Sequence, residues 1–146
     1  FNVNSTHVID MAFHLAGQPV SITAKVLSDL CWHPAGSVFA GCGHLKSGGL
    51  FSYHANWNSP GRWSIEIFTS RHRLIFCPLE KLRFQQLDGF DVKNYQLEDR
   101  LDVEFKPGIF RQVEHFIAED SRYLLPLNEH LDQLSTYQNM LLQSQK

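Results

Sequence analysis

Apolar residues near the start of the chain recur with the period of an α-helix. Their spacing at i, i+3, i+4 and i+7 predicts a helix over residues 5–16 with one apolar face. Asn4 or Ser5 is expected to cap this helix, because either side chain can accept a hydrogen bond from the first-turn amides. Gly17 is expected to end it, since glycine readily adopts the left-handed conformation that follows many helices. The apolar stripe consists of Val8, Met11, Ala12 and Leu15.

A long β region follows, in which apolar and polar residues alternate. The alternation over residues 20–26 is typical of a half-buried strand. Frequent glycines predict that the stretch 36–49 is broken into short strands and turns. Residues 50–57 and 63–69 predict two strands joined by a turn at 58–61, and this pair is expected to form an antiparallel hairpin. The glycines that mark the breaks are Gly36, Gly41, Gly43, Gly48 and Gly49.

Three more extended segments are predicted at 73–76, 82–87 and 92–97. The connections between them are too short for parallel crossovers, so neighbouring strands should be antiparallel. After Pro107-Gly108 the helical period returns, and a last helix is expected from near Leu127. The order of one helix, a β meander and two helices predicts an α+β fold, with helices covering one face of a sheet.

The length and charge of the chain narrow the range of functions. Its 146 residues fit a single domain, 1–146, that is large enough to bury a core. With 13 Lys and Arg against 15 Asp and Glu, the net charge of −2 provides no basic surface for nucleic acid or anionic lipid. No apolar run reaches the roughly 20 residues of a membrane span, and the first residues lack the features of a signal peptide. The sequence therefore predicts a cytoplasmic protein without a membrane partner.

The cysteines and the missing motifs exclude several kinds of chemistry. Cys31, Cys42 and Cys77 are odd in number and far apart, which argues against a disulfide framework and for reduced, buried or half-buried thiols. No Gly-x-Gly-x-x-Gly sequence follows a strand, so the chain is expected to have no cofactor-binding site for a dinucleotide. Serine-hydrolase and P-loop motifs are also absent from the sequence.

The first predicted helix carries the best candidates for acid–base chemistry. His7 and Asp10 lie three residues apart and therefore share one face, where they could act as a pair. A histidine near a helix N-terminus is held in its neutral form, in which it can accept a proton or a hydrogen bond. A packed or solvated histidine explains the pattern about as well. A metal site from His7, Asp10, His14 and the Cys42-Gly43-His44 cluster is a further alternative, but the spacing fits no zinc pattern and no metal is expected.

The segment 53–63 combines aromatic rings with hydrogen-bonding groups, as a carbohydrate site requires. Strand alternation places His54 and Asn56 on one face and Trp57 on the other, and Arg62 follows in the turn. These four residues are the candidates for substrate binding. The alternative is that the aromatic residues pack within the sheet or at a subunit contact.

Three segments together resemble the C-terminal domain of the Gfo/Idh/MocA oxidoreductases, the family of glucose–fructose oxidoreductase and inositol dehydrogenase. The resemblance covers nearly the whole chain, and it rests on the order and spacing of the segments. They are HVIDMAFHLAGQP at 7–19, SPGRWSIE at 59–66, and FRQVEHF at 110–116 with the closing Leu-rich helix.

The resemblance implies a large, mostly antiparallel open sheet of the dihydrodipicolinate-reductase type, which binds substrate and forms subunit interfaces. It implies an NAD(P)-dependent dehydrogenase acting on the CH–OH group of a sugar, sugar derivative or cyclitol. His7 matches the active-site histidine of the family and Asp10 the acidic residue after it. The family's polar residue one turn before the histidine is replaced by Val3, which leaves Asn4 as the stand-in.

The resemblance also implies that NAD or NADP binds to an N-terminal Rossmann domain that is absent from this chain. The isolated chain is therefore expected to be inactive and to bind a small sugar-like substrate. Because an exposed sheet edge and an open sheet face need cover, it is also expected to form a homo-oligomer, a dimer or tetramer, through its sheet. The alternative function is a non-catalytic sugar-binding or structural assembly module.

Overall fold

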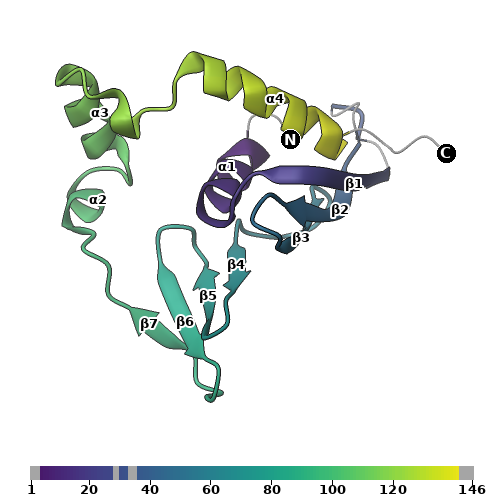
Figure 1. The fold of residues 1–146 in the computed structure, drawn as a ribbon, viewed down its shortest axis with the longest axis horizontal. Helices are drawn as coiled ribbons and strands as arrows, with labels where there is room; N and C mark the ends of the chain where they lie inside the picture. The colour runs from purple at the N-terminus through teal and green to yellow at the C-terminus, as the bar shows by residue number, and fades with distance from the viewer. Residues whose placement is uncertain (1–3, 28–29, 33–35, 142–146) are drawn as a thin grey trace. The chain divides into compact units, whose positions relative to one another are not determined.

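The computed structural model describes residues 4–27, 30–32 and 36–141. They form two compact units (Figure 1). The first unit extends to Trp63 and includes the chain from Gln133 onward, and the second is Ser64–Asp132. Both units contain antiparallel sheets, and helices occur in each, so the predicted α+β class is confirmed.

The first unit is built on an antiparallel sheet with the strand order β1-β2-β3. The strands are β1 (Pro19–Leu27), β2 (Val38–Leu45) and β3 (Leu50–Asn56). The predicted strands at 20–26 and 50–57 are therefore confirmed to within about one residue at most ends. In the middle of the strands the polar residues lie on an exposed face and the apolar residues face the core, whereas Val20, Leu27 and Leu50 near the strand ends are exposed.

Helices cover the apolar face of this sheet. The helix α1 (Ser5–Ala16) has the predicted bounds, and its Gly17 adopts a φ of 105° with its N–H bonded to the Phe13 carbonyl. Figure 1 shows α1 beside the three strands, with the last part of α4 (Leu127–Leu141) next to it. The core formed between helices and sheet consists of Ile9, Phe13, Val26, Phe39, Leu45, Tyr137 and Met140.

The N-terminal cap of α1 differs from the prediction. Asn4 occupies the N-cap position, but its side chain makes no capping hydrogen bond and its backbone is already near the helical region. Ser5 lies inside the helix and is buried. The helix is therefore held by the burial of Ile9 and Phe13 rather than by a side-chain cap.

The glycines of β2 do not break the strand, contrary to the prediction. Gly41 and Gly43 lie within a continuous strand, directly opposite Tyr53 and Phe51 of β3. A Cβ atom at Gly41 would lie 2.5 Å from the Tyr53 ring, and one at Gly43 would lie 2.8 Å from the Phe51 ring. The glycines thus leave room for two aromatic rings that lie across the sheet, which explains their presence in a strand.

The second unit contains a second antiparallel sheet, of order β4-β5-β6-β7. Its strands match the predicted extended segments, and its largest buried apolar residues are Ile65 and Ile75. The helices α2 and α3, a short 3-10 helix and residues 127–132 of α4 complete the unit. The bounds are β4 (Ile65–Phe68), β5 (His72–Phe76), β6 (Leu82–Gln86), β7 (Lys93–Tyr95), α2 (Arg100–Glu104), α3 (Ile109–Ile117) and η1 (Ser121–Tyr123).

The predicted hairpin between 50–57 and 63–69 is wrong. β3 pairs with β2, whereas β4 pairs with β5. The turn residues 58–61 are followed by an irregular stretch, and β4 begins only at Ile65. Antiparallel pairing is confirmed, but it is divided between sheets of three and four strands, so the expectation of one large sheet is met only in part.

The cysteines are free thiols in the structure, but two of them are more exposed than expected. Cys31 and Cys42 are exposed, and Cys77 is half-buried. Cys42 is exposed because it lies on the open face of β2, between the core-facing positions Gly41 and Gly43.

Among the described residues, no helix is long and apolar enough to cross a membrane.

Candidate functional site

His7 lies in the first turn of α1 with its side chain exposed. The centroid of its imidazole ring is 5.8 Å from that of the Trp63 indole, and the ring planes are inclined by 51°. Trp63 is itself 42% exposed. The two rings therefore form an accessible aromatic pair within the first unit, which combines an apolar surface with a titratable nitrogen.

Asp10 faces a different partner. The Tyr137 hydroxyl donates a hydrogen bond to Asp10 Oδ1 and lies 3.2 Å from Gln133 Oε1. Burial of Tyr137 and its bond to Asp10 raise the pKa of the phenol well above its ordinary value. Asp10 thus ties α1 to α4, and no hydrogen bond joins it to His7. Asn4, the third catalytic candidate, is exposed one turn before His7.

The substrate-binding candidates lie on two faces of the first sheet. His54 and Asn56 are exposed on the open face, and Asn56 Oδ1 accepts a hydrogen bond of 2.9 Å from the Asn58 amide. Trp57 packs against the core and meets the Trp32 ring edge-to-face, with 6.1 Å between centroids. Arg62 is exposed. The structure therefore brings His54 and Asn56 together, and it places Trp57 on the opposite side.

Tyr53 is a half-buried hydrogen-bonding residue that the sequence pattern did not single out. Its hydroxyl donates to the Met140 carbonyl at 3.0 Å, which joins β3 to the end of α4. Burial, with a smaller contribution from Cys42, raises the pKa of Tyr53 to about 12. The phenol is therefore protonated in the folded protein at pH values where an unfolded tyrosine ionises.

Stability should consequently fall as the pH rises from about 10 to about 12. An unfolded tyrosine has a pKa of about 10, so above this pH the unfolded state loses the proton that folded Tyr53 retains. Urea unfolding in reducing buffer at pH 8, 10 and 11 measures the slope. Tyr53→Phe should reduce the slope, and Tyr95→Phe, at an exposed tyrosine, should retain it. Equal slopes for the wild type and Tyr53→Phe would contradict this expectation.

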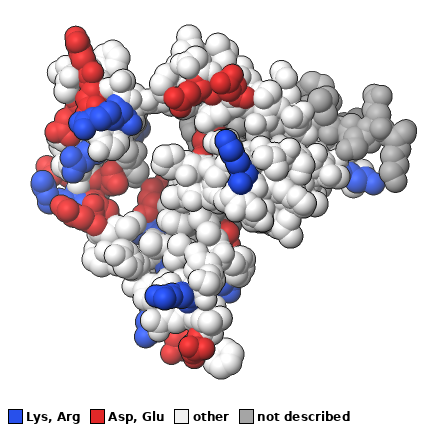
Figure 2. Space-filling model, in the orientation of Figure 1, with Lys and Arg blue, Asp and Glu red and all other residues white. Residues whose placement is uncertain are grey.

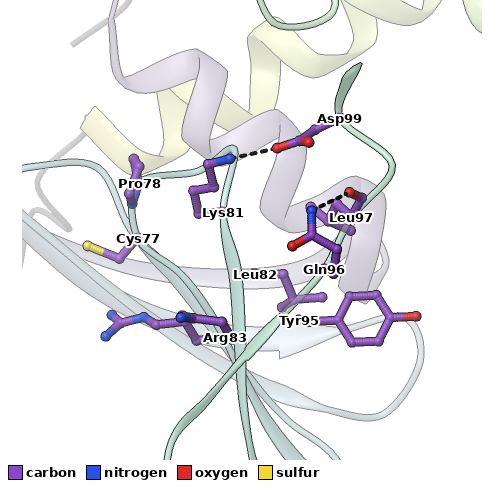
Figure 3. A pocket seen from close by; sticks show the side chains of 10 residues that line it. Cys77, Pro78, Lys81, Leu82, Arg83, Tyr95, Gln96, Leu97 and Asp99 are labelled. Carbon is purple, nitrogen blue, oxygen red and sulfur yellow. Dashed lines mark hydrogen bonds and ion pairs between the residues drawn. The ribbon is translucent and has the colours of Figure 1, made fainter. Parts of the chain in front are cut away.

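The second unit contains a cavity of about 450 Å³ between the turn after β5 and the strands β6 and β7 (Figure 3). Lys81 Nζ lies 2.6 Å from Asp99 Oδ2 at this cavity, and the hydrogen bond lowers the pKa of Asp99. Figure 3 shows Lys81 directed toward Asp99, whereas Arg83 extends away from this pair on the side of Cys77. The sequence pattern gave no indication of this cavity except a charged residue between the apolar Leu82 and Phe84 of a strand.

A second cluster of polar residues surrounds Asp120. Arg122 contacts the carboxylate through Nε and Nη2, both at 2.8 Å, and His115 Nδ1 lies 3.2 Å from Oδ2. The hydrogen bonds from Arg122 hold the pKa of Asp120 well below its usual range. The His115 ring packs against the Tyr123 ring, with 4.5 Å between the ring centroids. The carboxylate is thus fully occupied, and the cluster fastens the end of α3 to η1.

Charges of both signs are mixed on the face shown in Figure 2, including the region of α2 and α3. Each of these helices has one ion pair within it at 3.3 Å, Arg100–Glu104 in α2 and Arg111–Glu114 in α3. No group of three or more His, Cys, Asp or Glu side chains among the described residues could hold a metal ion.

Comparisons with protein-family models, curated proteins and solved structures find no match to this chain.

Proposed function

We propose that this chain is the substrate-binding part of an NAD(P)-dependent oxidoreductase acting on a CH–OH group of a sugar, sugar derivative or cyclitol. The proposal includes the fold of the Gfo/Idh/MocA C-terminal domain, in which one large open sheet carries the site. Its support is the order of the three motif segments, together with a helix that leads directly into an antiparallel sheet.

The observation that carries the proposal is the exposed pair of His7 and Trp63. An indole face packs against the C–H groups of a sugar ring, while a neutral imidazole accepts a hydrogen bond from a hydroxyl. A sugar site needs the indole face and the imidazole acceptor side by side. The 5.8 Å between the ring centroids of His7 and Trp63 allows one ring-sized ligand to contact both side chains. His7 would accept the hydroxyl proton, and Asp10, held by Tyr137, would fix the helix that carries it.

The dinucleotide does not fit the described residues. All strand pairs in both sheets are antiparallel, so these residues contain no βαβ unit of the kind that binds NAD or NADP. The cofactor is therefore assigned to another part of the protein. The role of this chain is to bind the substrate and to hold the proton of its hydroxyl group.

Replacing His7 by alanine should weaken the binding of a cyclitol or sugar by about fivefold to tenfold, the usual worth of one hydrogen bond. The measurement is an NMR titration of the chain with myo-inositol and with D-glucose, following the indole N–H of Trp63. His14→Ala is the matched control, because His14 is exposed on the same helix two turns later. Equal affinities for the wild type and His7→Ala, or no saturable shift with either ligand, would count against the proposal.

The alternative function, a non-catalytic sugar-binding or assembly module, is favoured by the exposed apolar side chains. Phe116 and Ile117 of α3 are 73% and 76% exposed, and Leu50 at the start of β3 is 76% exposed. Apolar surface of this kind is typical of regions that contact another protein or subunit. The same titration separates the assembly module from the proposal, because a purely structural module binds neither myo-inositol nor D-glucose at His7 and Trp63. A non-catalytic sugar-binding module would bind them, and the absence of NAD(P)-dependent oxidation of the bound sugar by the full-length protein would identify it.

A further inference from the structure

The cavity of the second unit has the size and the lining of a small-molecule site. Its volume of about 450 Å³ lies in the range of ligand-binding pockets. The turn after β5 forms one wall through Cys77 and Pro78, and the adjacent strands β6 and β7 contribute Arg83 and Asn94. All of its walls belong to the second unit, so the cavity is defined without reference to His7 or to the proposed oxidoreductase function.

Arg83 is the unusual residue of this cavity. It lies on β6, an interior strand, opposite Ile75 on one side and Asn94 on the other. Its Nε atom is buried and has no hydrogen-bond partner among the described residues. Other arginines do not share this situation, since they either bond a carboxylate or are exposed. The paired ones are Arg73, Arg100, Arg111 and Arg122, and the exposed ones without a carboxylate partner are Arg62 and Arg71.

The positive charge of Arg83 is not balanced within the cavity. A guanidinium group stays protonated in proteins, so it cannot lose its charge to relieve burial. The carboxylate of Asp99 is bound to Lys81 at 2.6 Å and therefore neutralises that ammonium group. Arg83 as a whole is only half-buried, so the rest of its guanidinium group is open to a ligand. Water there would leave the charge uncompensated, whereas an anion would balance it.

We propose that this cavity binds the carboxylate or phosphate group of a small ligand through Arg83. The planar guanidinium fork matches the geometry of either oxyanion. Asn94 is the cross-strand neighbour of Arg83, so its side chain leaves the sheet on the same face and can donate a further hydrogen bond. The Lys81–Asp99 pair closes another side of the cavity and offers polar groups to the remainder of the ligand.

The test is a titration of the whole chain that follows the arginine Nε–H signals by ¹H–¹⁵N NMR. Inorganic phosphate and D-gluconate are the two probes, and sodium chloride keeps the ionic strength constant. Arg83 Nε–H should shift saturably with at least one probe, and the probe that binds more tightly identifies the preferred oxyanion. Arg83→Gln should weaken binding by about tenfold or more, because a charge-assisted bidentate contact is lost. Arg71→Gln, at an exposed arginine outside the cavity, should bind as the wild type does.

The proposal is overturned if neither probe shifts the Arg83 signal saturably, or if sodium chloride alone produces the same shift. It is also overturned if folded Arg83→Gln binds as tightly as the wild type. Should Arg83→Gln not fold, the wild-type Nε–H titration still decides, and Arg83→Lys provides a variant that retains the charge. Arg83→Lys should bind more weakly than the wild type, since it lacks the fork.

Discussion

Replacing Phe39 by alanine is expected to lower the free energy of unfolding by about 3–5 kcal/mol. Phe39 has no exposed surface and lies on the central strand of the first sheet, opposite Val26 and Ala55. Its ring fills the layer between the strands and α1, so its removal leaves a cavity that the surrounding helices and strands cannot fill. A typical domain is stable by about 5–15 kcal/mol, so this loss would be a large part of the total.

The effect should be measured by urea unfolding at neutral pH. Leu50→Ala is the control, because Leu50 lies in the same sheet but is 76% exposed, and a surface substitution of this kind changes stability by about 0.5 kcal/mol or less. Similar losses in the two variants would show that the core is not organised around Phe39. Since α1 docks on this core, the Phe39 variant should also lose the ordered contact between His7 and Trp63.

Local periodicity was sufficient to predict most elements of the fold. The bounds of α1 were predicted correctly because the apolar stripe and Gly17 mark the same helix. The strands β1 and β3 followed from alternation alone, and α3 and α4 from the return of the helical period after Gly108. The pattern gives the type of element, but it does not always give the buried face. In α1 the buried apolar residues are Ile9 and Phe13, which lie outside the predicted stripe, and Leu15 of that stripe is 47% exposed. The helix α3 has no buried residue, so its apolar positions mark the helix without being packed.

The pairing of strands could not be predicted in the same way. The turn signal at 58–61 is genuine, but a turn does not determine which strands hydrogen-bond to each other. The strand β2 was obscured by Gly41 and Gly43, which are explained only by the rings of Tyr53 and Phe51 on the neighbouring strand. Once β2 is recognised as a full strand, it becomes the partner of β3, and β4 pairs with β5.

The short helix α2 escaped prediction for a different reason. Its five residues, Arg100–Glu104, are too few to show a helical repeat of apolar positions. It is held by local bonds such as the one from the Phe105 amide to the Leu101 carbonyl. Asp102 Oδ1 also accepts a hydrogen bond of 2.8 Å from the Gly108 amide, which connects the helix to the turn before α3.

The contacts of the candidate site residues could not be predicted either, because they join parts of the chain that are distant in sequence. The exposure of His7 follows from its position outside the apolar stripe, but its contact with Trp63 depends on how the unit folds. Asp10 meets Tyr137, which is 127 residues away in sequence, so spacing suggested the nearer His7 instead. Arg83 is apparent in the sequence only as one polar position in an alternating strand. Its missing partner becomes evident when β5, β6 and β7 are assembled.

Gly43→Ala should disrupt the first sheet, with an expected loss of about 3 kcal/mol or more, at or above the upper end of the range for overpacking. An added Cβ atom would lie 1.9 Å from the Ser21 carbonyl oxygen and 2.8 Å from the Phe51 ring. A ring can turn aside, but the Ser21 oxygen belongs to the backbone of the paired strand. The strands β1 and β2 must therefore separate locally, and their hydrogen bonds lengthen.

Gly61→Ala is the matched control, because its added Cβ atom would meet nothing within 4 Å and its backbone does not require a positive φ. It should leave stability unchanged or raise it slightly, since alanine restricts the unfolded chain. Urea unfolding gives both values, and amide hydrogen exchange should accelerate along β1 and β2 only in Gly43→Ala. A Gly43→Ala protein as stable as Gly61→Ala would mean that Phe51 and Ser21 do not enclose this position. Because α1 packs on these strands, Gly43→Ala should also weaken sugar binding at His7 and Trp63, although it alters neither residue. Oxyanion binding at Arg83, in the second unit, should persist in Gly43→Ala.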